Sequence, residues 1–398
     1  MSKIAELIQE KCPNGVPYKK IREIATTSIG LATNVTKWKR SKGVQLLHNS
    51  DIKQNKIVVK NYEYIDEKMA QKNKSKVHEL NDIITVHTGD VGTSAVITND
   101  YVGSIGFTTL LTKINDIDEV NPFYLCHYLN SEISKQQIEK VTISDRNNLN
   151  QKSFNELVIP IPPIEVQEEI VRILDKFSEL KAELEAELEA RKKQYEFYLN
   201  KLINRSGKIF TLGSIGKISM CKRIFKNQTT NSGDIPFYKI GTFGKKATSY
   251  ISKKVWEEYK EKYSYPKKGD ILISAAGTIG KTVIFDGTPS YFQDSNIVWI
   301  ENDETKVLNK YLYYFYQTNP WVISSGGTIS RIYNDDIAKI KISIPPQEEQ
   351  NRIVNILDKF DKLINDISAG LPAEIEARRK QYEYYRNKLL NFEELKDE

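Results

Sequence analysis

Two long stretches of the chain carry apolar and aromatic residues at helical spacing. In the first, these positions step by threes and fours from Ile170 to Leu202, and in the second from Ile353 to Leu389. Such spacing keeps one stripe on one helix face and predicts two coiled-coil helices, each with a local stutter where steps of four follow one another. The seam positions expected to pack or to dock partner chains are Ile170, Phe177, Leu184, Leu188, Tyr195, Tyr198, Ile353, Phe360, Leu371, Tyr382 and Tyr385.

Prolines mark where each stretch begins and where one is interrupted. Pro163 and Pro346 stand at the expected helix starts, which suit proline because its φ is fixed and its missing N–H is not needed there. Pro372 lies inside the second stretch, close to Gly370. Because proline cannot donate the backbone hydrogen bond of a helix interior, we expect the second helix to kink or restart near Gly370 and Pro372.

Outside these stretches the pattern changes to short apolar runs separated by Gly, Asn and Asp. Runs such as 83–86, 95–97, 271–274, 282–285 and 296–300 predict short strands, and residues 122–131 predict a short helix. We therefore expect four segments: a globular domain at 1–158, a long helix at 159–206, a second globular domain at 207–341, and a second long helix at 342–398, kinked near 370–372.

The chain repeats its own phrases in the same order. Ile-Pro-Pro begins at Ile161 and at Ile344, and Ile-Leu-Asp-Lys-Phe ends at Phe177 and at Phe360. Further pairs are Glu-Ala-Arg-(Lys/Arg)-Lys-Gln-Tyr-Glu at 189–196 and 376–383, Asp82 with Gly89 and Gly92 against Asp270 with Gly277 and Gly280, 121–125 against 309–313, and 44–47 against 235–238. Two equal halves suggest a protein that recognises two separate targets, one with each half.

The order of the segments predicts the architecture. A globular domain joins the end of the first helix to the start of the second, so the chain returns along its own length and the two helices pair antiparallel. The expected fold class is α+β: two α/β domains separated by two long antiparallel coiled-coil helices with pseudo-twofold internal symmetry. The alternative is that both stretches are ordinary core helices of one compact domain.

Charge points to nucleic acid only through its distribution. The net charge is +6, and much of the acid lies in the first helix at residues 183–189, which leaves the positive charge concentrated elsewhere. Basic residues gather around Trp38 and near Phe225, as in proteins that contact phosphates, although solvated lysine loops look the same. The candidate DNA contacts are Lys37, Lys39, Arg40, Lys74, Lys76 and Arg146 in the first half and Arg223, Lys226, Lys245, Lys246, Lys281 and Arg331 in the second.

Base reading by the same domains would use other residue types as well. Asn147, Asn148 and Gln293 are candidates because a carboxamide can bond adenine, as arginine can bond guanine. Arg146 and Arg331 form the preferred arginine pair, since each lies shortly before an Ile-Pro-Pro element.

Motifs of catalysis and metal binding are weak. Cys12, Cys126 and Cys221 are isolated, and the four histidines have no metal-ligand spacing, so neither disulfides nor a metal site are expected. Residues 275–282 nearly spell a phosphate-binding loop but lack its first glycine, and a glycine-rich turn explains both copies. The absence of a signal core and of a membrane-spanning stretch predicts a cytoplasmic protein without membrane contact.

The Ile-Pro-Pro helices, the 370–385 segment and the two interposed domains resemble the specificity subunits of type I restriction-modification systems, over essentially the whole chain. The resemblance implies a non-catalytic subunit in which each domain reads one half of a gapped double-stranded DNA target. It also implies that the helices dock two adenine-methyltransferase subunits, to which ATP-driven restriction subunits are added. S-adenosylmethionine, ATP and magnesium would then be bound by those partners, and no cofactor by this chain.

The helices in such a subunit would set the number of unread base pairs. The tandem Ala-Glu-Leu-Glu at 182–189 is a place where their length could change, and one added unit would lengthen a helix by ~6 Å. The segments 191–198 and 378–385, rich in Lys, Arg and Tyr, are expected to offer docking surface.

Two other classes of function stay open from the sequence. The chain could be a nuclease or methyltransferase in its own right, against which stands the absence of motifs such as Asn-Pro-Pro-Tyr. It could also be a coiled-coil adaptor without its own DNA readout.

Overall fold

The structure is a computed structural model that describes residues 2–141, 148–205, 207–321, 331–366 and 368–395. The chain forms two compact units. The first unit comprises 1–185 together with 374–398, and the second comprises 186–373. Each unit therefore holds one α/β globular part and a share of the long helices.

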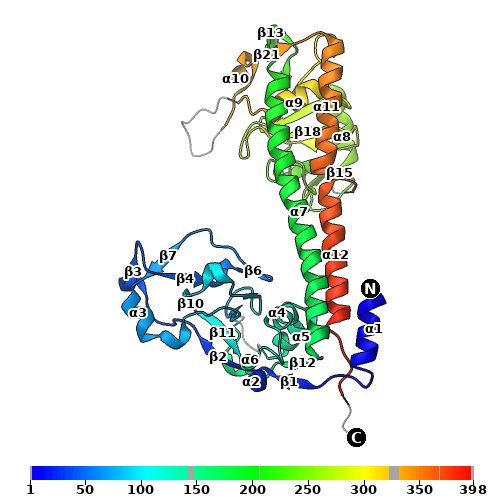
Figure 1. Cartoon of the computed structure of the whole chain (residues 1–398). Coiled ribbons are helices and arrows are strands. Elements are labelled where there is room, and N and C mark those ends of the chain that lie inside the picture. The colour runs from blue at the N-terminus through cyan, green and yellow to red at the C-terminus, as the bar shows by residue number, and fades with distance from the viewer. Residues whose placement is uncertain (1, 142–147, 206, 322–330, 367, 396–398) are drawn as a thin grey trace. The chain divides into compact units, whose positions relative to one another are not determined.

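Two four-stranded sheets form the β-structure of the first unit (Figure 1). One is antiparallel in the order β2-β11-β8-β9, and the other has the order β10-β4-β7-β3 with β10 parallel to β4. Their bounds are β2 Ala25–Ile29, β11 Thr109–Ile114, β8 Ile83–Val86, β9 Ser94–Val96, β10 Ile105–Phe107, β4 Val44–His48, β7 Glu63–Ile65 and β3 Lys39–Arg40. Short pairs join β1 (Tyr18–Lys20) to β12 (Val158–Pro160) and β5 (Ile52–Lys53) to β6 (Lys56–Ile57).

The helices of the first unit are α1 Ser2–Lys11, α2 Ile21–Ile24, α3 Glu67–Lys72, α4 Pro122–Leu129, α5 Glu132–Val141 and α6 Gln151–Asn155, with 3-10 turns η1 Thr36–Trp38, η2 Asn49–Asp51, η3 Lys74–Lys76 and η4 Asn99–Tyr101. Helices α2, α4 and α6 pack against strands of the antiparallel sheet. Helix α4 begins with an Asn121 side chain that accepts two backbone N–H groups and with Pro122 at its first position, so the predicted short helix starts at a cap.

The second unit repeats this topology. Its sheets have the orders β14-β20-β17-β18 and β16-β15-β19, again with one parallel pair, β15 with β19, and β13 pairs with β21. The bounds are β14 Ile218–Ser219, β20 Ile297–Ile300, β17 Ile271–Ser274, β18 Thr282–Ile284, β16 Tyr250–Ile251, β15 Ile235–Tyr238, β19 Tyr291–Phe292, β13 Lys208–Thr211, β21 Lys341–Ile344, α8 Lys253–Lys262, α9 Asn309–Gln317, α10 Asn334–Lys339, η5 Leu212–Ser214 and η6 Lys226–Gln228. The predicted strands and the predicted internal repeat are confirmed.

One predicted correspondence between the halves is wrong by one residue. The buried Gln167 accepts a hydrogen bond from the backbone N–H of Asn121, and the buried Gln350 accepts one from Leu308, both at 2.9 Å. Asn121 therefore corresponds to Leu308 rather than to Asn309. The sequence pattern pairs two asparagines, Asn121 and Asn309. The hydrogen bonds instead pair the backbone N–H groups of Asn121 and Leu308.

The long helices differ in continuity. Helix α7 (Ile164–Ile203) runs unbroken for 40 residues. The second stretch is two helices, α11 (Gln347–Asn365) and α12 (Leu371–Leu389), so the chain restarts rather than only kinks. Pro372 lies in the first turn of α12, where its missing N–H costs little. Gly370 is required at the break, because a Cβ there would lie 2.6 Å from the carbonyl oxygens of Lys362 and Leu363.

Aromatic stacking joins α7 to the second stretch within each unit. In the first unit the Phe177 ring stacks on Tyr385 with centroids 5.4 Å apart, and in the second unit Tyr198 stacks on Phe360 at 5.8 Å. Later residues of α7 thus meet earlier residues of the second stretch, which makes the pairing antiparallel (Figure 1).

The seam positions are covered to different degrees. Ile170 and Ile353 are fully buried and Leu371 and Tyr382 nearly so, whereas Phe177, Leu184, Leu188, Tyr195, Tyr198, Phe360 and Tyr385 are partly exposed. The ends of the helices also complete the globular cores: Val166, Ile170 and Leu174 pack in the core of the first unit, and Leu199, Leu202 and Ile203 in that of the second.

Candidate nucleic-acid interface

A basic groove opens on the second unit where three loops meet. It holds about 290 Å³ and lies between the segment after β14, the end of β15 and the turn from β19 to β20. We call it the Arg223 groove; its polar and charged lining includes Arg223, Lys226, Lys239, Gln293, Asp294 and Asn296. The groove unites three residues that the sequence singled out separately, Arg223, Lys226 and Gln293.

Arg223 is held in this groove by a carboxylate. Its Nε donates to Asp294 Oδ2 at 2.8 Å, with the Arg223 side chain 63% exposed and the Asp294 side chain 18% exposed. The partner comes from a turn 71 residues further along the chain, which no local pattern in the sequence reveals.

The turn that carries Asp294 adopts an uncommon backbone conformation. Ser295 has φ +54°, a left-handed conformation that costs a non-glycine residue free energy, and its carbonyl accepts a hydrogen bond from Arg331 Nη2. In the first unit, the turn from β10 to β11 holds Thr108 at φ +51°, and its carbonyl accepts from Asn49 Nδ2 at 3.2 Å. Both halves thus clamp a strained turn at the same topological place.

The first unit carries a basic cluster around Trp38, at η1 and β3. The ammonium groups of Lys37 and Lys72 lie 6.0 and 5.8 Å from the Trp38 ring centroid, so Lys72 joins the two lysines, Lys37 and Lys39, predicted from the sequence. Lys39 pairs with Glu63 at 2.7 Å, and this contact lowers the pKa of the Glu63 carboxyl. We call Lys37, Trp38, Lys39, Arg40 and Lys72 the Trp38 cluster.

Several predicted contacts serve the fold itself. Arg40 donates to Asp66 at 3.0 Å and to the carbonyls of Lys37 and Lys39, so it clips its own loop. Lys76 donates to the Gly30 carbonyl at 3.0 Å and Lys281 to the Phe243 carbonyl at 2.6 Å. Lys74, Lys245 and Lys246 are exposed, Arg146 and Asn147 lie outside the described residues, and Asn148 forms an isolated bridge with Thr88.

The glycine-rich motifs are hairpin turns. Gly277 and Gly280, with φ +68° and +79°, connect strand β17 to strand β18, and Gly89 and Gly92 connect β8 to β9 in the same way. A phosphate-binding loop of the type that the sequence nearly spells leads from a strand into a helix. A Cβ on Gly280 would lie 2.0 Å from Trp321 Nε1, so close packing explains this glycine.

A comparison with protein families matches the chain twice. The family described as the type I restriction modification DNA specificity domain matches residues 13–191 and again 205–377. Together the two matches cover most of the chain and follow its internal repeat. The chain belongs to the type I restriction-modification specificity subunits.

Curated relatives share this family. A putative type I restriction enzyme specificity subunit of Haemophilus influenzae is 56% identical over 301 residues, covering 73% of this chain and 77% of the relative. The specificity subunit of the EcoR124I and EcoR124II enzymes of Escherichia coli is 34% identical over 293 residues, covering 68% and 70%.

Solved structures share the fold of this specificity subunit. A chain from a study of assembly and conformational transition of the type I system superposes with a TM-score of 0.66 at 17% identity, covering 95% of this chain and 98% of that one. The specificity subunit of M. genitalium superposes with a TM-score of 0.53 at 15% identity, covering 96% and 98%. These superpositions show the fold, and the two family matches show that DNA sequence recognition is the function of this specificity subunit.

Sequence reading missed a matched pair of glutamines in the specificity subunit. The Oε1 of each glutamine accepts from the backbone N–H just before α4 or α9. Gln167 Nε2 donates to the carbonyls of Glu119 and Pro162, and Gln350 Nε2 donates to those of Lys306 and Pro345, at 2.7–3.0 Å. Each amide thus fastens a long helix to its globular part. The repeated Ile-Pro-Pro phrase could have revealed this pair, since each glutamine lies a few residues after one copy of it.

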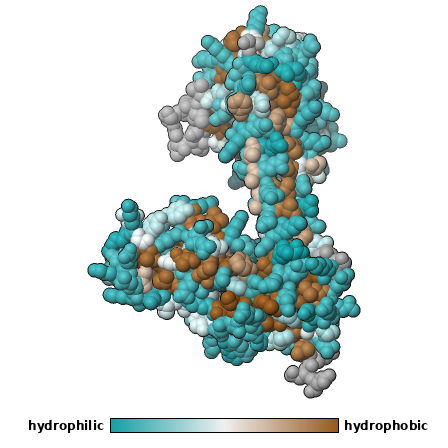
Figure 2. Space-filling model, in the orientation of Figure 1, coloured by the Kyte–Doolittle hydropathy of each residue, from teal (hydrophilic) through white to brown (hydrophobic). Residues whose placement is uncertain are grey.

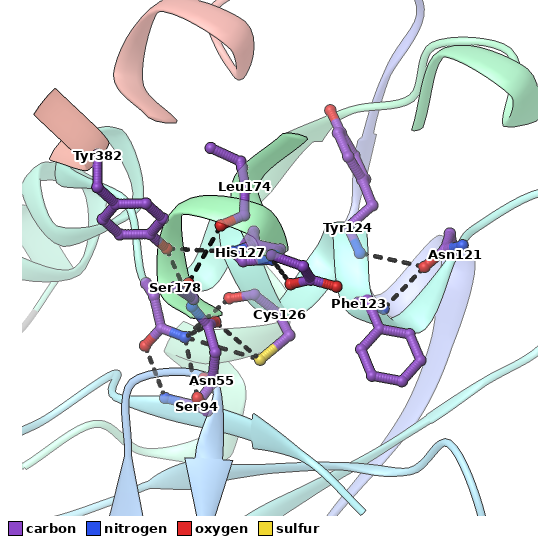
Figure 3. Close-up of polar contacts among 12 residues, drawn as sticks. Asn55, Ser94, Asn121, Phe123, Tyr124, Cys126, His127, Leu174, Ser178 and Tyr382 are labelled. Atoms are coloured by element: carbon purple, nitrogen blue, oxygen red, sulfur yellow. Dashed lines mark hydrogen bonds and ion pairs between the residues drawn. The ribbon is translucent and has the colours of Figure 1, made fainter. Parts of the chain in front are cut away.

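A second fastening differs between the units. In the first, the buried His127 of α4 pairs with Asp175 of α7 at 2.8 Å and contacts the Tyr382 hydroxyl of α12 at 3.2 Å (Figure 3). Asn55 and Asn130 extend this network, Asn55 donating to Tyr382 and Asn130 to Asn55. In the second unit, Tyr314 of α9 donates to Asp358 of α11, the counterpart of Asp175.

Other chemistry finds little support in the described part of the chain. No three His, Cys, Asp or Glu side chains among the described residues gather as a metal site. Burial raises the pKa of Cys126 and Cys221, the latter to about 12, so neither thiol is a nucleophile at neutral pH. Within the described ranges, no helix is both apolar and long enough to cross a bilayer.

Exposed aromatic residues occur at one repeated position of the helices. Phe197 on α7 and Tyr384 on α12 each stand two residues after the tyrosine of the repeated Lys-Gln-Tyr-Glu phrase, and each is 61% exposed. Figure 2 shows hydrophobic residues interspersed among hydrophilic ones along these helices. Hydrophobic residues exposed singly are normal on a protein surface, but aromatic residues exposed at two equivalent positions are candidates for contacts with another protein.

Proposed function

We propose that the two globular parts of this specificity subunit each read one half of a gapped double-stranded DNA target, while the long helices set the gap and dock two methyltransferase subunits. The observation that carries the proposal is the duplicated topology: one four-stranded sheet order recurs in full, the other recurs without one edge strand, and each half bears a basic surface. In the first unit this surface is the Trp38 cluster, and in the second it is the Arg223 groove.

Phosphate contact falls to the exposed lysines of these surfaces. Lys37 and Lys74 in the first unit, and Lys226, Lys245 and Lys246 in the second, have exposed side chains that suit contacts with the DNA backbone. Four predicted residues have side chains that donate to backbone carbonyls and act instead by holding loops in place: Arg40, Lys76, Lys281 and Arg331.

The chemical steps belong to partner subunits. Methylation of adenine would be carried out by methyltransferase subunits with S-adenosylmethionine, and ATP and magnesium would serve restriction subunits. The specificity subunit would determine which DNA site is modified and would contribute no catalytic group.

A map of adenine methylation tests the reading role. The map is made in source cells with the gene for this chain, without it, and with the gene restored. Loss and return of one motif in two parts, separated by a fixed gap, supports the proposal. An unchanged map in cells that express the complex contradicts it and favours an adaptor without DNA readout.

The docking role is assigned to Phe197 and Tyr384. Ile170 and Ile353 are fully buried in the specificity subunit and are not available to a partner, whereas the two exposed aromatic residues lie one in each unit. Equivalent surfaces at equivalent places suit two copies of one partner.

The stoichiometry of the complex tests this assignment. Purified chain and methyltransferase subunit are mixed, and the mass of the complex is measured by light scattering. Phe197→Ala and Tyr384→Ala should each weaken one of two partner sites, and the double variant both. Ile209→Ala, which removes a 60% exposed side chain from β13, is the control. Full retention of two partners by the double variant would sink the assignment.

A further inference from the structure

The Arg223 groove contains an arginine that one carboxylate orients and that keeps N–H donors without a hydrogen bond among the described residues. We propose that Arg223 reads a guanine in the half-site of the second unit, with Asp294 as the residue that positions it. This inference rests on the proposed function, because it assumes that the second unit reads DNA.

Asp294 engages only part of the Arg223 guanidinium. A guanidinium has five N–H donors in a planar fork. The ion pair uses Nε at 2.8 Å, and the Arg223 side chain stays 63% exposed. The carboxylate therefore orients the guanidinium through Nε, and within the described residues the Nη groups of Arg223 make no hydrogen bond. Guanine presents O6 and N7 in the major groove, and a bidentate pair with arginine is the commonest specific contact to them.

The support beneath Asp294 is itself held in place. The side chain of Gln293 accepts from the Ile240 N–H at 2.9 Å, and the Gln293 N–H donates to the Tyr238 carbonyl at 2.9 Å. On the other side of Asp294, Ser295 adopts the left-handed conformation, and its carbonyl accepts a hydrogen bond from Arg331. Holding the Arg223 side chain against a rigid turn that carries Asp294 lowers the entropy lost on binding and fixes the register of the contact.

The surroundings of Arg223 suit a duplex. Lys226 and Lys239 line the same groove and are exposed, so three cations face one carboxylate there. Lysines at the rim would contact phosphates and bring the arginine to the base edges. Arg40 in the first unit lacks this freedom, since it donates to two backbone carbonyls in addition to Asp66.

The test measures specificity and affinity separately. The complete complex with its methyltransferase subunits carries Arg223→Ala, Arg223→Lys, Asp294→Asn or Lys226→Ala. Competition binding compares the natural duplex with duplexes substituted at each position of both half-sites, at several salt concentrations. Unfolding is monitored by circular dichroism, so that a misfolded variant is recognised and replaced by Arg223→Gln.

Arg223→Ala should reduce discrimination about 10- to 100-fold at one G·C pair of one half-site and leave the other half-site unchanged. Arg223→Lys should keep the salt dependence but lose the same discrimination, because lysine lacks the planar fork. Asp294→Asn should relax the same base pair to a lesser degree. Lys226→Ala should weaken binding to all duplexes alike and lower the salt slope by about one.

Two results would overturn the inference. One is an equal loss of affinity for natural and substituted duplexes in Arg223→Ala and Arg223→Gln, which is the behaviour of a phosphate contact. The other is full discrimination at every position despite the substitution. Failure of the proposed function looks different, because the unaltered complex would then show no preference among the duplexes.

Discussion

At the residue scale, the fold depends on side chains that join segments far apart in the sequence. Gln167 and Gln350 each make three hydrogen bonds to backbone groups while nearly or fully buried. The sequence could place these glutamines near a helix start, but two of the three backbone groups that each one satisfies lie more than 40 residues away. The same holds for Arg223, whose role depends on Asp294.

Removal of one buried glutamine should therefore be costly. Gln350→Ala leaves the Leu308 N–H and the carbonyls of Lys306 and Pro345 without their partner, and the free energy of unfolding of the second unit should fall by about 2–3 kcal/mol. Gln347→Ala, on the exposed first residue of α11, is the matched control and should change it by less than about 0.5 kcal/mol. Urea denaturation measures both. Equal effects of the two variants would show that the amide contributes nothing special.

An ion pair at the start of α11 predicts a dependence on pH. Arg352 and Arg205 lower the pKa of Glu349 to about 2, from an ordinary value of 4.5. A carboxyl with a lowered pKa in the folded state stabilises the fold fully above its unfolded pKa, and this contribution is lost as the pH falls from about 4.5 toward about 2.

Glu349→Gln should therefore lower the thermal unfolding midpoint at pH 6, and the difference from the unaltered chain should shrink as the pH is lowered to 3. Glu348→Gln, on the neighbouring exposed residue, serves as the control. A difference that grows toward acid pH would show that the sign of this linkage is wrong.

At the element scale, the sequence gives the type of most elements but not how they end. Apolar runs correctly located β8, β17 and β20, and the helical stripe correctly located α7. Pro372 correctly marked a disturbance in the second stretch. Whether a proline kinks a helix or restarts it depends on its surroundings. Here these are the carbonyls of Lys362 and Leu363, which lie against Gly370. The sequence alone does not reveal such contacts.

The hairpin between β17 and β18 needs glycine at position 280. Gly280 has φ +79°, and a Cβ there would lie 2.0 Å from Trp321 Nε1. Gly280→Ala should therefore lower the free energy of unfolding by at least about 1–2 kcal/mol. Gly241→Ala is the matched control, because a Cβ there has no neighbour within 4 Å. Thermal unfolding of both variants decides the matter, and an unchanged midpoint for Gly280→Ala would contradict the packing described.

The aromatic seam gives a further prediction at this scale. Phe360 lies against both Tyr195 and Tyr198, whereas Phe197 is 61% exposed. Phe360→Ala should destabilise the second unit by about 2–3 kcal/mol, somewhat less than a fully buried phenylalanine, and Phe197→Ala should leave stability nearly unchanged. Urea denaturation of the two variants separates packing from docking; equal losses would mean that Phe197 belongs to the seam.

At the scale of the whole molecule, the internal repeat is what the sequence predicts best. Phrases that recur in order predicted two like halves. The halves share the order of one four-stranded sheet, and the second sheet recurs with one strand fewer. Each half also matches the specificity family. The sequence located the local part of each basic surface, residues 37–40 in the first half and Arg223 with Lys226 in the second. It could not locate Lys72, Lys239 or Asp294, because these residues join the surfaces from loops that are separate along the chain.

The proposed role of the helices predicts an effect of their length. Insertion of one Ala-Glu-Leu-Glu unit after Glu189 lengthens α7 by ~6 Å and should increase the number of unread base pairs while both half-site sequences stay the same. A methylation map of cells that carry the insertion reports the new gap. A change in the bases of either half-site, with the gap unaltered, would show that the helix does not set the spacing.

The central claim is that the two units read two half-sites together at one spacing. Its most direct test is methylation by the complete complex of duplexes that carry the mapped motif, the motif with one half-site scrambled, or both half-sites with the gap changed by one base pair. We predict that scrambling either half-site, or changing the gap, lowers the rate at least about 100-fold, since each mismatched base pair typically costs about 1–3 kcal/mol. Methylation of a duplex with a single half-site as fast as that of the intact target would contradict the account.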